Sequence, residues 1–159
     1  MGIRVLFLYP NTFGMNMVPP AIAFLSALLK KEGHEVELFD STYYSLSYGV
    51  NSEGIKAEQL NVVPFDLASR GIRMKTSNWR EDLSTQVERF LPDLIAVSST
   101  EDMWELALIL LGEFEDYVRR HDIPVIAGGV FPTFAPQLVI NHPLISMVCI
   151  GEGENALVE

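Results

Sequence analysis

Four stretches of the chain are almost continuously apolar, which is typical of strands covered on both faces of a sheet. They are residues 3–9, 94–98, 124–128 and 147–150. Residues 35–40 alternate acidic and apolar side chains instead, which predicts a strand with one exposed face. The pattern therefore predicts five strands, with residues 35–40 at an edge of the sheet.

Segments with apolar residues at helical spacing separate these strands. In the first, Pro20 stands where its missing N–H costs nothing, Ile22, Leu25 and Leu29 share one side, and Gly33 ends the helix. Its length suits a crossover between parallel neighbours. The other helices are expected at residues 79–90, from Asp102 as N-cap to about 120, at 136–141, and from 151 onward.

Residues 41–78 interrupt this alternation with a polar insertion, much longer than the usual connection of about 2–6 residues. A short helix is expected near residues 53–60. Tyr43, Tyr44 and Tyr48 either pack over a flat macrocycle or, more commonly, anchor the insertion. The basic residues at its end either meet a cofactor phosphate or form a solvated face: they are Arg70, Arg73, Lys75 and Arg80.

Alternating strands and helices predict an α/β domain in which helices cover both faces of a parallel sheet. With residues 35–40 at an edge, the strand order is 2-1-3-4-5. This is the flavodoxin-like, Rossmann-like doubly wound arrangement in three layers. Ligands bind such sheets beyond the carboxyl ends of the strands, where the strand order reverses. Here that switch point lies between the first and third strands.

Composition narrows the classes of partner. The chain has 159 residues, enough for one domain, and a formal net charge of −10, which disfavours nucleic acid and anionic membranes as partners. Its one cysteine, Cys149, permits neither an internal disulfide nor a multi-cysteine metal site, and its place in a buried strand predicts an inert thiol. No apolar run reaches the ~18 residues of a membrane span, so the cytoplasm is the expected compartment.

Loops rich in small and hydroxyl residues follow the carboxyl ends of the four apolar strands. Glycines let a ligand approach the backbone closely, and hydroxyl and N–H groups suit a ligand with amides or phosphates. Alone, a Gly-Gly is usually a turn and a Ser-Ser-Thr usually an N-cap; Glu101 and Asp102 also fit capping. Because the four loops share one sheet edge, we expect cofactor contacts from Pro10, Asn11, Thr12, Ser98, Ser99, Thr100, Gly128, Gly129, Phe131, Gly151, Glu152 and Gly153.

An ordered set of motifs runs through nearly the whole chain outside the insertion. The set comprises residues 4–11 (RVLFLYPN), 20–27, 33–40 (GHEVELFD), 92–98 (PDLIAVS), 125–129 (VIAGG), 132–133 (PT) and 148–154 (VCIGEGE). In this order they resemble the N-terminal cobalamin (vitamin B12)-binding domain of cobalamin-dependent radical SAM enzymes. The resemblance implies that cobalamin lies at the carboxyl edge of the sheet.

In that family a radical SAM barrel follows the cobalamin domain, and its cysteine triplet holds the iron–sulfur cluster that binds SAM. The resemblance implies methyl transfer or related radical chemistry in the parent enzyme. With Cys149 alone, this chain has no such triplet. We therefore expect the cluster, SAM and the barrel beyond residue 159, with the barrel as the partner of this domain.

One departure concerns the cobalt ligand. Cobalamin domains of mutases and methionine synthase carry a ligating histidine in the loop after the first strand, but residues 10–16 contain none. The three histidines, His34, His121 and His142, fit surface or helix-end positions better. The resemblance then implies cobalamin without a protein histidine ligand.

Two alternatives belong to other functional classes. An FMN-binding flavodoxin-like electron-transfer domain is suggested by residues 11–16, although they lack a dense Ser/Thr run and Pro20 delays the helix that would receive the phosphate. A cofactor-free docking domain of the same fold is the other alternative. A phosphoacceptor receiver is disfavoured because no acidic cluster follows the first strand.

Overall fold

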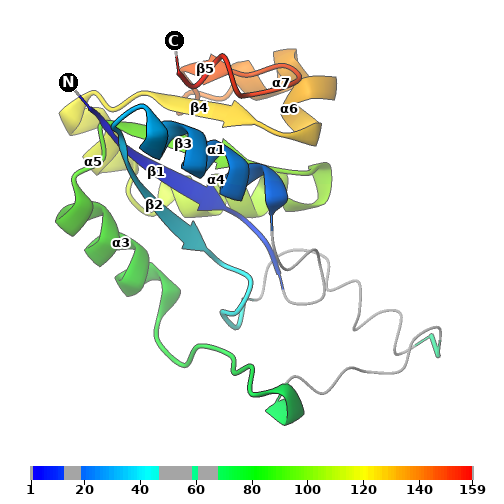
Figure 1. Cartoon of the computed structure of the whole chain (residues 1–159). Helices are drawn as coiled ribbons and strands as arrows, with labels where there is room; N and C mark the ends of the chain where they lie inside the picture. Colours follow the sequence, from blue (N-terminus) through cyan, green and yellow to red (C-terminus); the bar gives the residue numbers. More distant parts are fainter. Residues whose placement is uncertain (1, 13–18, 47–58, 61–67, 159) are drawn as a thin grey trace.

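The five predicted strands form one parallel sheet in the predicted order, β2-β1-β3-β4-β5 (Figure 1). This computed structural model describes residues 2–12, 19–46, 59–60 and 68–158, and the statements below concern those residues. Tyr9 pairs with Asp40 and Ser98 pairs with Gly128, so the carboxyl ends of neighbouring strands are level. The strands are β1 (Arg4–Tyr9), β2 (Glu35–Asp40), β3 (Leu94–Ser98), β4 (Val125–Gly128) and β5 (Met147–Val148).

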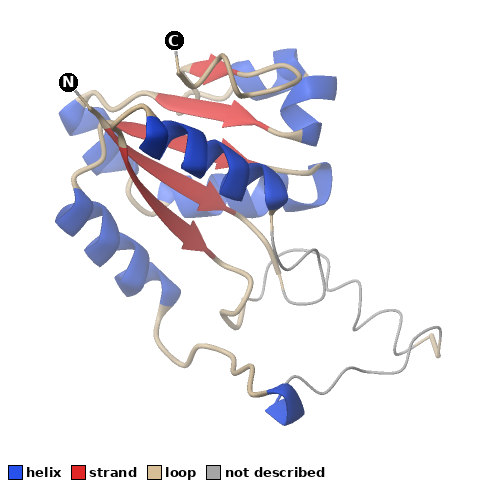
Figure 2. Cartoon of the chain, in the orientation of Figure 1, coloured by secondary structure: helices blue, strands red, loops and turns tan. Residues whose placement is uncertain are grey.

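Helices cover the two faces of the sheet unequally, as Figure 2 shows. On one face α1 (Pro20–Lys31) packs Ile22 and Leu29 against Val5 and Phe7. The other face is covered by α3 (Trp79–Phe90), α4 (Trp104–Gly112), α5 (Glu115–His121) and α7 (Pro136–Ile140). The α1 face is thus covered more thinly, by one helix and by Leu157 near the end of the chain.

None of the helices in the described part of the chain is long and apolar enough to cross a membrane.

The prediction of one continuous helix between residues 102 and 120 is wrong. The segment is divided into the 3-10 turn η2 (Glu101–Met103), α4 and α5, and Phe114 breaks it with φ −129° and ψ 27°. Phe114 is buried, so the backbone leaves the helix where its ring enters the core. Asp102 does not cap α4, because it lies inside η2.

Other differences lie near the C-terminal end. A short helix not expected from sequence, α6 (Val130–Phe134), directly follows β4. β5 has only two residues, so Cys149 lies beyond it and is half-buried. The helix expected from residue 151 is wrong: residues 154–158 form turns, with the Leu157 N–H donating to the Gly153 carbonyl at 3.1 Å.

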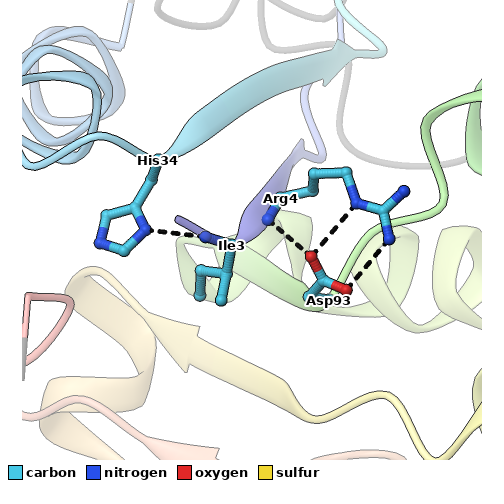
Figure 3. A network of polar contacts seen from close by, with 4 residues as sticks. All are labelled: Ile3, Arg4, His34 and Asp93. Carbon is cyan, nitrogen blue, oxygen red and sulfur yellow. Dashed lines mark hydrogen bonds and ion pairs between the residues drawn. The ribbon is translucent and has the colours of Figure 1, made fainter. Parts of the chain in front are cut away.

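The amino-end edge of the sheet is held by two contacts to the start of β1 (Figure 3). The Arg4 guanidinium donates to both carboxylate oxygens of Asp93, at 3.2 and 3.1 Å, and the Arg4 N–H donates to the same carboxylate at 2.8 Å. His34 accepts a hydrogen bond at Nδ1 from the Ile3 N–H, at 3.0 Å. His34 therefore lies at the edge opposite the predicted site, as expected.

Tyr44 anchors the two ends of the insertion to the domain. Its ring is buried and stacks on Phe39, with centroids 5.5 Å apart, and its hydroxyl donates to Asp82 at 2.7 Å. Lys75 donates to the same hydroxyl at 3.0 Å. Burial and the Asp82 carboxylate raise the pKa of Tyr44. The anchoring role is confirmed for Tyr44. Tyr48 and residues 53–58 lie outside the described residues. The 3-10 turn η1 (Ala68–Arg70) lies between the insertion and α3.

Candidate functional site

A cavity of about 130 Å³, here called the α1 cavity, lies between the sheet and α1. Phe7, Ala96 and Ile126 contribute from the strands, and Phe24 and Leu25 contribute from α1. Ala21 of α1 also lines it, and the remaining lining residues come from the strand ends and the last segment of the chain: Val97, Ser98, Gly128, Gly129, Cys149, Gly151, Glu152, Gly153, Glu154 and Leu157. The cavity exists because one helix does not cover this face as far as β5.

A second cavity of about 160 Å³, here called the switch-point cavity, lies beyond the ends of β1 and β3. Tyr9, Pro10, Asn11, Ser98, Ser99 and Thr100 line it, together with Ala21, Met103, Gly129 and Val130. Ala21, Ser98 and Gly129 line both cavities, so the two are neighbours along one edge. This edge is where a doubly wound sheet binds its ligands.

All but two of the predicted site residues line one of these cavities. The exceptions are Thr12, which is buried, and Phe131, whose ring is tilted against that of Trp104 with centroids 5.5 Å apart. Helix α6 begins at Val130, and Phe131 packs against the core beside α4 instead of lining the cavity. A cofactor contact from Phe131 or Thr12 stays a prediction.

A buried polar network holds the loop after β1. The Asn11 N–H donates to the Ser41 hydroxyl at 2.8 Å, and that hydroxyl donates to the Asn11 carbonyl, also at 2.8 Å. The Asn11 side-chain amide donates to the Thr42 hydroxyl at 2.9 Å, and the Thr42 N–H donates to Asp40 at 2.9 Å. Ser41 and Thr42 are fully buried, so the start of the insertion positions a loop of the switch-point cavity.

Gly128 and Gly129 differ in the room around them. A Cβ on Gly128 would have only Cys149 Cβ nearby, at 3.6 Å. A Cβ on Gly129 would meet the backbone of Ser99, and Gly129 has φ +98°. The space that a side chain would need at Gly129 is therefore taken by Ser99. A cofactor contact from either glycine, both of which line the α1 cavity, stays a prediction.

Thr133 joins the loops after β4 and β5. Its hydroxyl donates to the Gly129 carbonyl at 2.8 Å and accepts from the Gly151 N–H at 3.1 Å. Two loops that line the α1 cavity are therefore fixed relative to each other by one side chain.

Of the two cavities, only the α1 cavity is lined by carboxylates, and no described basic side chain lines either one. Glu152 and Glu154 line the α1 cavity, and none of the lining residues of either cavity is Lys, Arg or His. Burial, and then the charge of Glu154, raise the pKa of the Cys149 thiol, which therefore stays protonated near neutral pH.

Two of the basic residues near the end of the insertion, Lys75 and Arg80, serve other contacts. Arg80 pairs with Glu113 at 3.0 Å and lies over the Trp79 ring, and Lys75 donates to Tyr44. Neither lines a cavity, so a phosphate-binding role at this edge is not supported for them.

Sequence reasoning missed the apolar half of the site. Phe24, Leu25, Ile126 and Leu157 line the α1 cavity, and none of them was expected there from the sequence. One signal was present: apolar residues occupy more of α1 than a single buried stripe requires, and Phe24 is 57% exposed.

Known proteins match this chain over most of its length. The family model described as "B12 binding domain" matches residues 9–159. The chain is 26% identical over 136 residues to cytidylyl-2-hydroxyethylphosphonate methyltransferase of Streptomyces wedmorensis, which covers 86% of this chain and 22% of that protein.

Two solved structures of the radical S-adenosylmethionine methyltransferase TsrM from Kitasatospora setae have a similar fold. One contains cobalamin and an iron–sulfur cluster, and the other contains tryptophan and a SAM analogue. Each matches with a TM-score of 0.61 and 20% identity, over 99% of this chain and 25% of the other. The chain thus spans about a quarter of the length of these relatives. Because the family model covers nearly the whole chain, from the end of β1 onward, this protein belongs to the B12 binding domain family.

Proposed function

We propose that this chain binds cobalamin at the carboxyl edge of its sheet and serves as the cobalamin module of a larger radical SAM enzyme. The observation that carries the proposal is the pair of adjoining cavities at the switch point, in a chain that matches the B12 binding domain over residues 9–159. The bound cofactor would supply a cobalt centre able to carry a methyl group.

The residues present fit the parts of this cofactor. Cobalamin has a corrin ring with amide side chains and a tail of phosphate, ribose and dimethylbenzimidazole. The α1 cavity is walled by Phe7, Phe24, Leu25 and Leu157 and is similar in size to the ~150 Å³ apolar cavity that takes up benzene in another protein. It suits the flat aromatic base, and a larger side chain at Gly128 would fill it.

The switch-point cavity suits polar parts of the cofactor. Ser98, Ser99 and Thr100 present hydroxyl groups beside the loop at Pro10 and Asn11. Hydroxyl and backbone N–H groups of this kind match amides and a phosphate ester. These residues would orient the ring over the end of β1.

Cobalt would have no histidine ligand from this chain. His34 bonds to Ile3 at the opposite edge, and His121 packs on Tyr117 with ring centroids 4.4 Å apart. His142 lines neither cavity, and residues 10–16 contain no histidine.

The rest of the activity belongs to the parent protein. A barrel holding the iron–sulfur cluster and SAM would stand beside this edge, and the methyl transfer or related radical reaction would occur between them. The chain covers a quarter or less of its relatives, which leaves room for such a barrel. A single cysteine and a net charge of −10 suit a cytoplasmic protein.

Titration of the chain with hydroxocobalamin tests the proposal. We expect saturable but weak binding, because the titrated chain has no barrel to cover the upper face of the cobalamin. The visible spectrum of the bound cobalamin should lack the signature of histidine coordination. FMN in parallel titrations should not bind. Tight FMN binding would favour the electron-transfer alternative, and no binding of either cofactor would favour the cofactor-free docking domain.

A further inference from the structure

Glu154 places a buried acceptor atom in the wall of the α1 cavity. Its Oε2 is buried and has no hydrogen-bond partner in the described part of the chain, although the residue as a whole is only half-buried. An unsatisfied buried carboxylate oxygen destabilises a fold, and native proteins rarely retain one without a purpose.

None of the described donors around Glu154, the Ser98 hydroxyl of the same cavity included, bonds to its Oε2. The other side chains of the α1 cavity are mostly apolar, and no basic residue lines it. The Cys149 thiol is protonated but donates to the Glu152 carbonyl, at 3.8 Å. A donor on the occupant of the cavity would satisfy Oε2.

The size and charge of the cavity select the part of the ligand that enters. At about 130 Å³ it is too small for a macrocycle, so only the end of a nucleotide tail fits. Glu152 and Glu154 together repel a phosphate, which must stay nearer the mouth. The benzimidazole base of cobalamin has no N–H at neutral pH, so the donors of the tail are its ribose hydroxyls.

We propose that Glu154 accepts a hydrogen bond from a ribose hydroxyl of the cobalamin tail, and thereby selects cobalamin over corrinoids that lack this nucleotide. The inference rests on the proposed function and adds the recognition of the tail. It gives the second glutamate of the Gly-Glu-Gly-Glu motif a role that sequence reasoning did not assign.

Binding of two ligands to three proteins tests this. Hydroxocobalamin and cobinamide, which lacks the nucleotide tail, are titrated into the wild-type chain, Glu154→Leu and Glu154→Gln. Glu154→Leu should weaken cobalamin binding at least tenfold and change cobinamide binding less than twofold. Glu154→Gln retains an acceptor oxygen and should lie between. Glu88→Leu, on an exposed position of α3, is the matched control and should change neither affinity.

A second readout comes from the unliganded protein. Because Oε2 is buried and unpartnered, Glu154→Leu should raise the thermal midpoint even though it weakens cobalamin binding. If Glu154→Leu does not fold, the ratio of the two affinities in Glu154→Gln decides.

The outcomes separate the two claims. Unchanged cobalamin affinity in both variants overturns the role of Glu154 and leaves the proposed function standing. Equal weakening of cobalamin and cobinamide places the contact on the corrin ring and also overturns it. A wild-type chain that binds neither ligand overturns the proposed function itself.

Discussion

Gly129 and Ser99 are packed so closely that a Cβ atom on Gly129 would lie 3.0 Å from the Ser99 carbonyl oxygen. The same Cβ would lie 3.1 Å from the Ser99 nitrogen. The Ser99 carbonyl also accepts from the Phe131 N–H at 3.2 Å, so the loops after β3 and β4 are joined at this point. Gly129 has φ +98° and ψ −165°, a conformation essentially reserved for glycine.

Gly129→Ala should therefore lower the free energy of unfolding by about 1–3 kcal/mol, from backbone strain and the contact with Ser99. Gly128→Ala is the matched control, because its Cβ has ordinary contacts and its backbone is a strand; it should leave stability unchanged or slightly higher. Urea unfolding of both variants measures the difference. Equal stability of the two variants would contradict the account of this loop.

Ser41 carries the buried network beneath Asn11. In Ser41→Ala the Asn11 N–H and carbonyl lose their shared partner in a buried place, which should cost about 1–3 kcal/mol. Thr85→Ala, on an exposed position of α3, should change stability by no more than about 0.5 kcal/mol. Chemical unfolding checks both, and a neutral Ser41→Ala would show that the network does not hold the loop.

The Arg4–Asp93 contact predicts a dependence of stability on pH. Hydrogen bonds from the Arg4 side chain, and then from its backbone, lower the pKa of Asp93 below its ordinary 3.8. The stabilisation is therefore present above about pH 4 and is lost as the pH falls through the lowered pKa of the folded state.

Asp93→Asn should reduce stability at pH 7 by about 1 kcal/mol or less, because the Asp93 side chain is 43% exposed. The difference from wild type should be constant between pH 5 and 8 and shrink at about pH 4 and below. Unfolding series at several pH values measure it, with Glu88→Gln as an exposed control. A difference that grew as the pH fell would contradict the assignment.

Cys149 reports on the α1 cavity because it lines the cavity and is the only cysteine. Burial raises its pKa, so iodoacetamide should react slowly near neutral pH and faster as the pH rises. Saturating hydroxocobalamin should slow the reaction at least severalfold, whereas FMN should not. Mass spectrometry of the alkylated chain follows the reaction. Full reactivity in the presence of bound cobalamin would place the cofactor elsewhere.

The sheet was predictable because its signal is local. The apolar runs of β1, β3 and β4 and the alternation in β2 each appear within a few residues, and short parallel crossovers then fix the order. The break at Phe114 was not predictable, because helical spacing continues through it and only tertiary burial of the ring interrupts the helix.

The candidate site was predictable only on its polar side. The strand order identifies which loops lie at the ligand-binding edge, so the sequence alone predicted that Pro10, Ser98 and Gly128 lie there. The apolar wall was missed because Phe24 and Leu157 carry no chemistry that distinguishes a cavity from a core. The packing of Gly129 on Ser99 depends on the close approach of two loops, which a single sequence does not reveal.

The affinity of Gly128→Val for hydroxocobalamin, measured beside that of wild type, tests the central claim most directly. Valine is compatible with this strand-end backbone, and its side chain would occupy part of the α1 cavity. We expect binding at least tenfold weaker, or about 1.4 kcal/mol, with a thermal midpoint close to wild type. Gly112→Ala, which adds a methyl group in open space, should bind as wild type does. A folded Gly128→Val that binds cobalamin with unchanged affinity would show that the cofactor does not use this cavity.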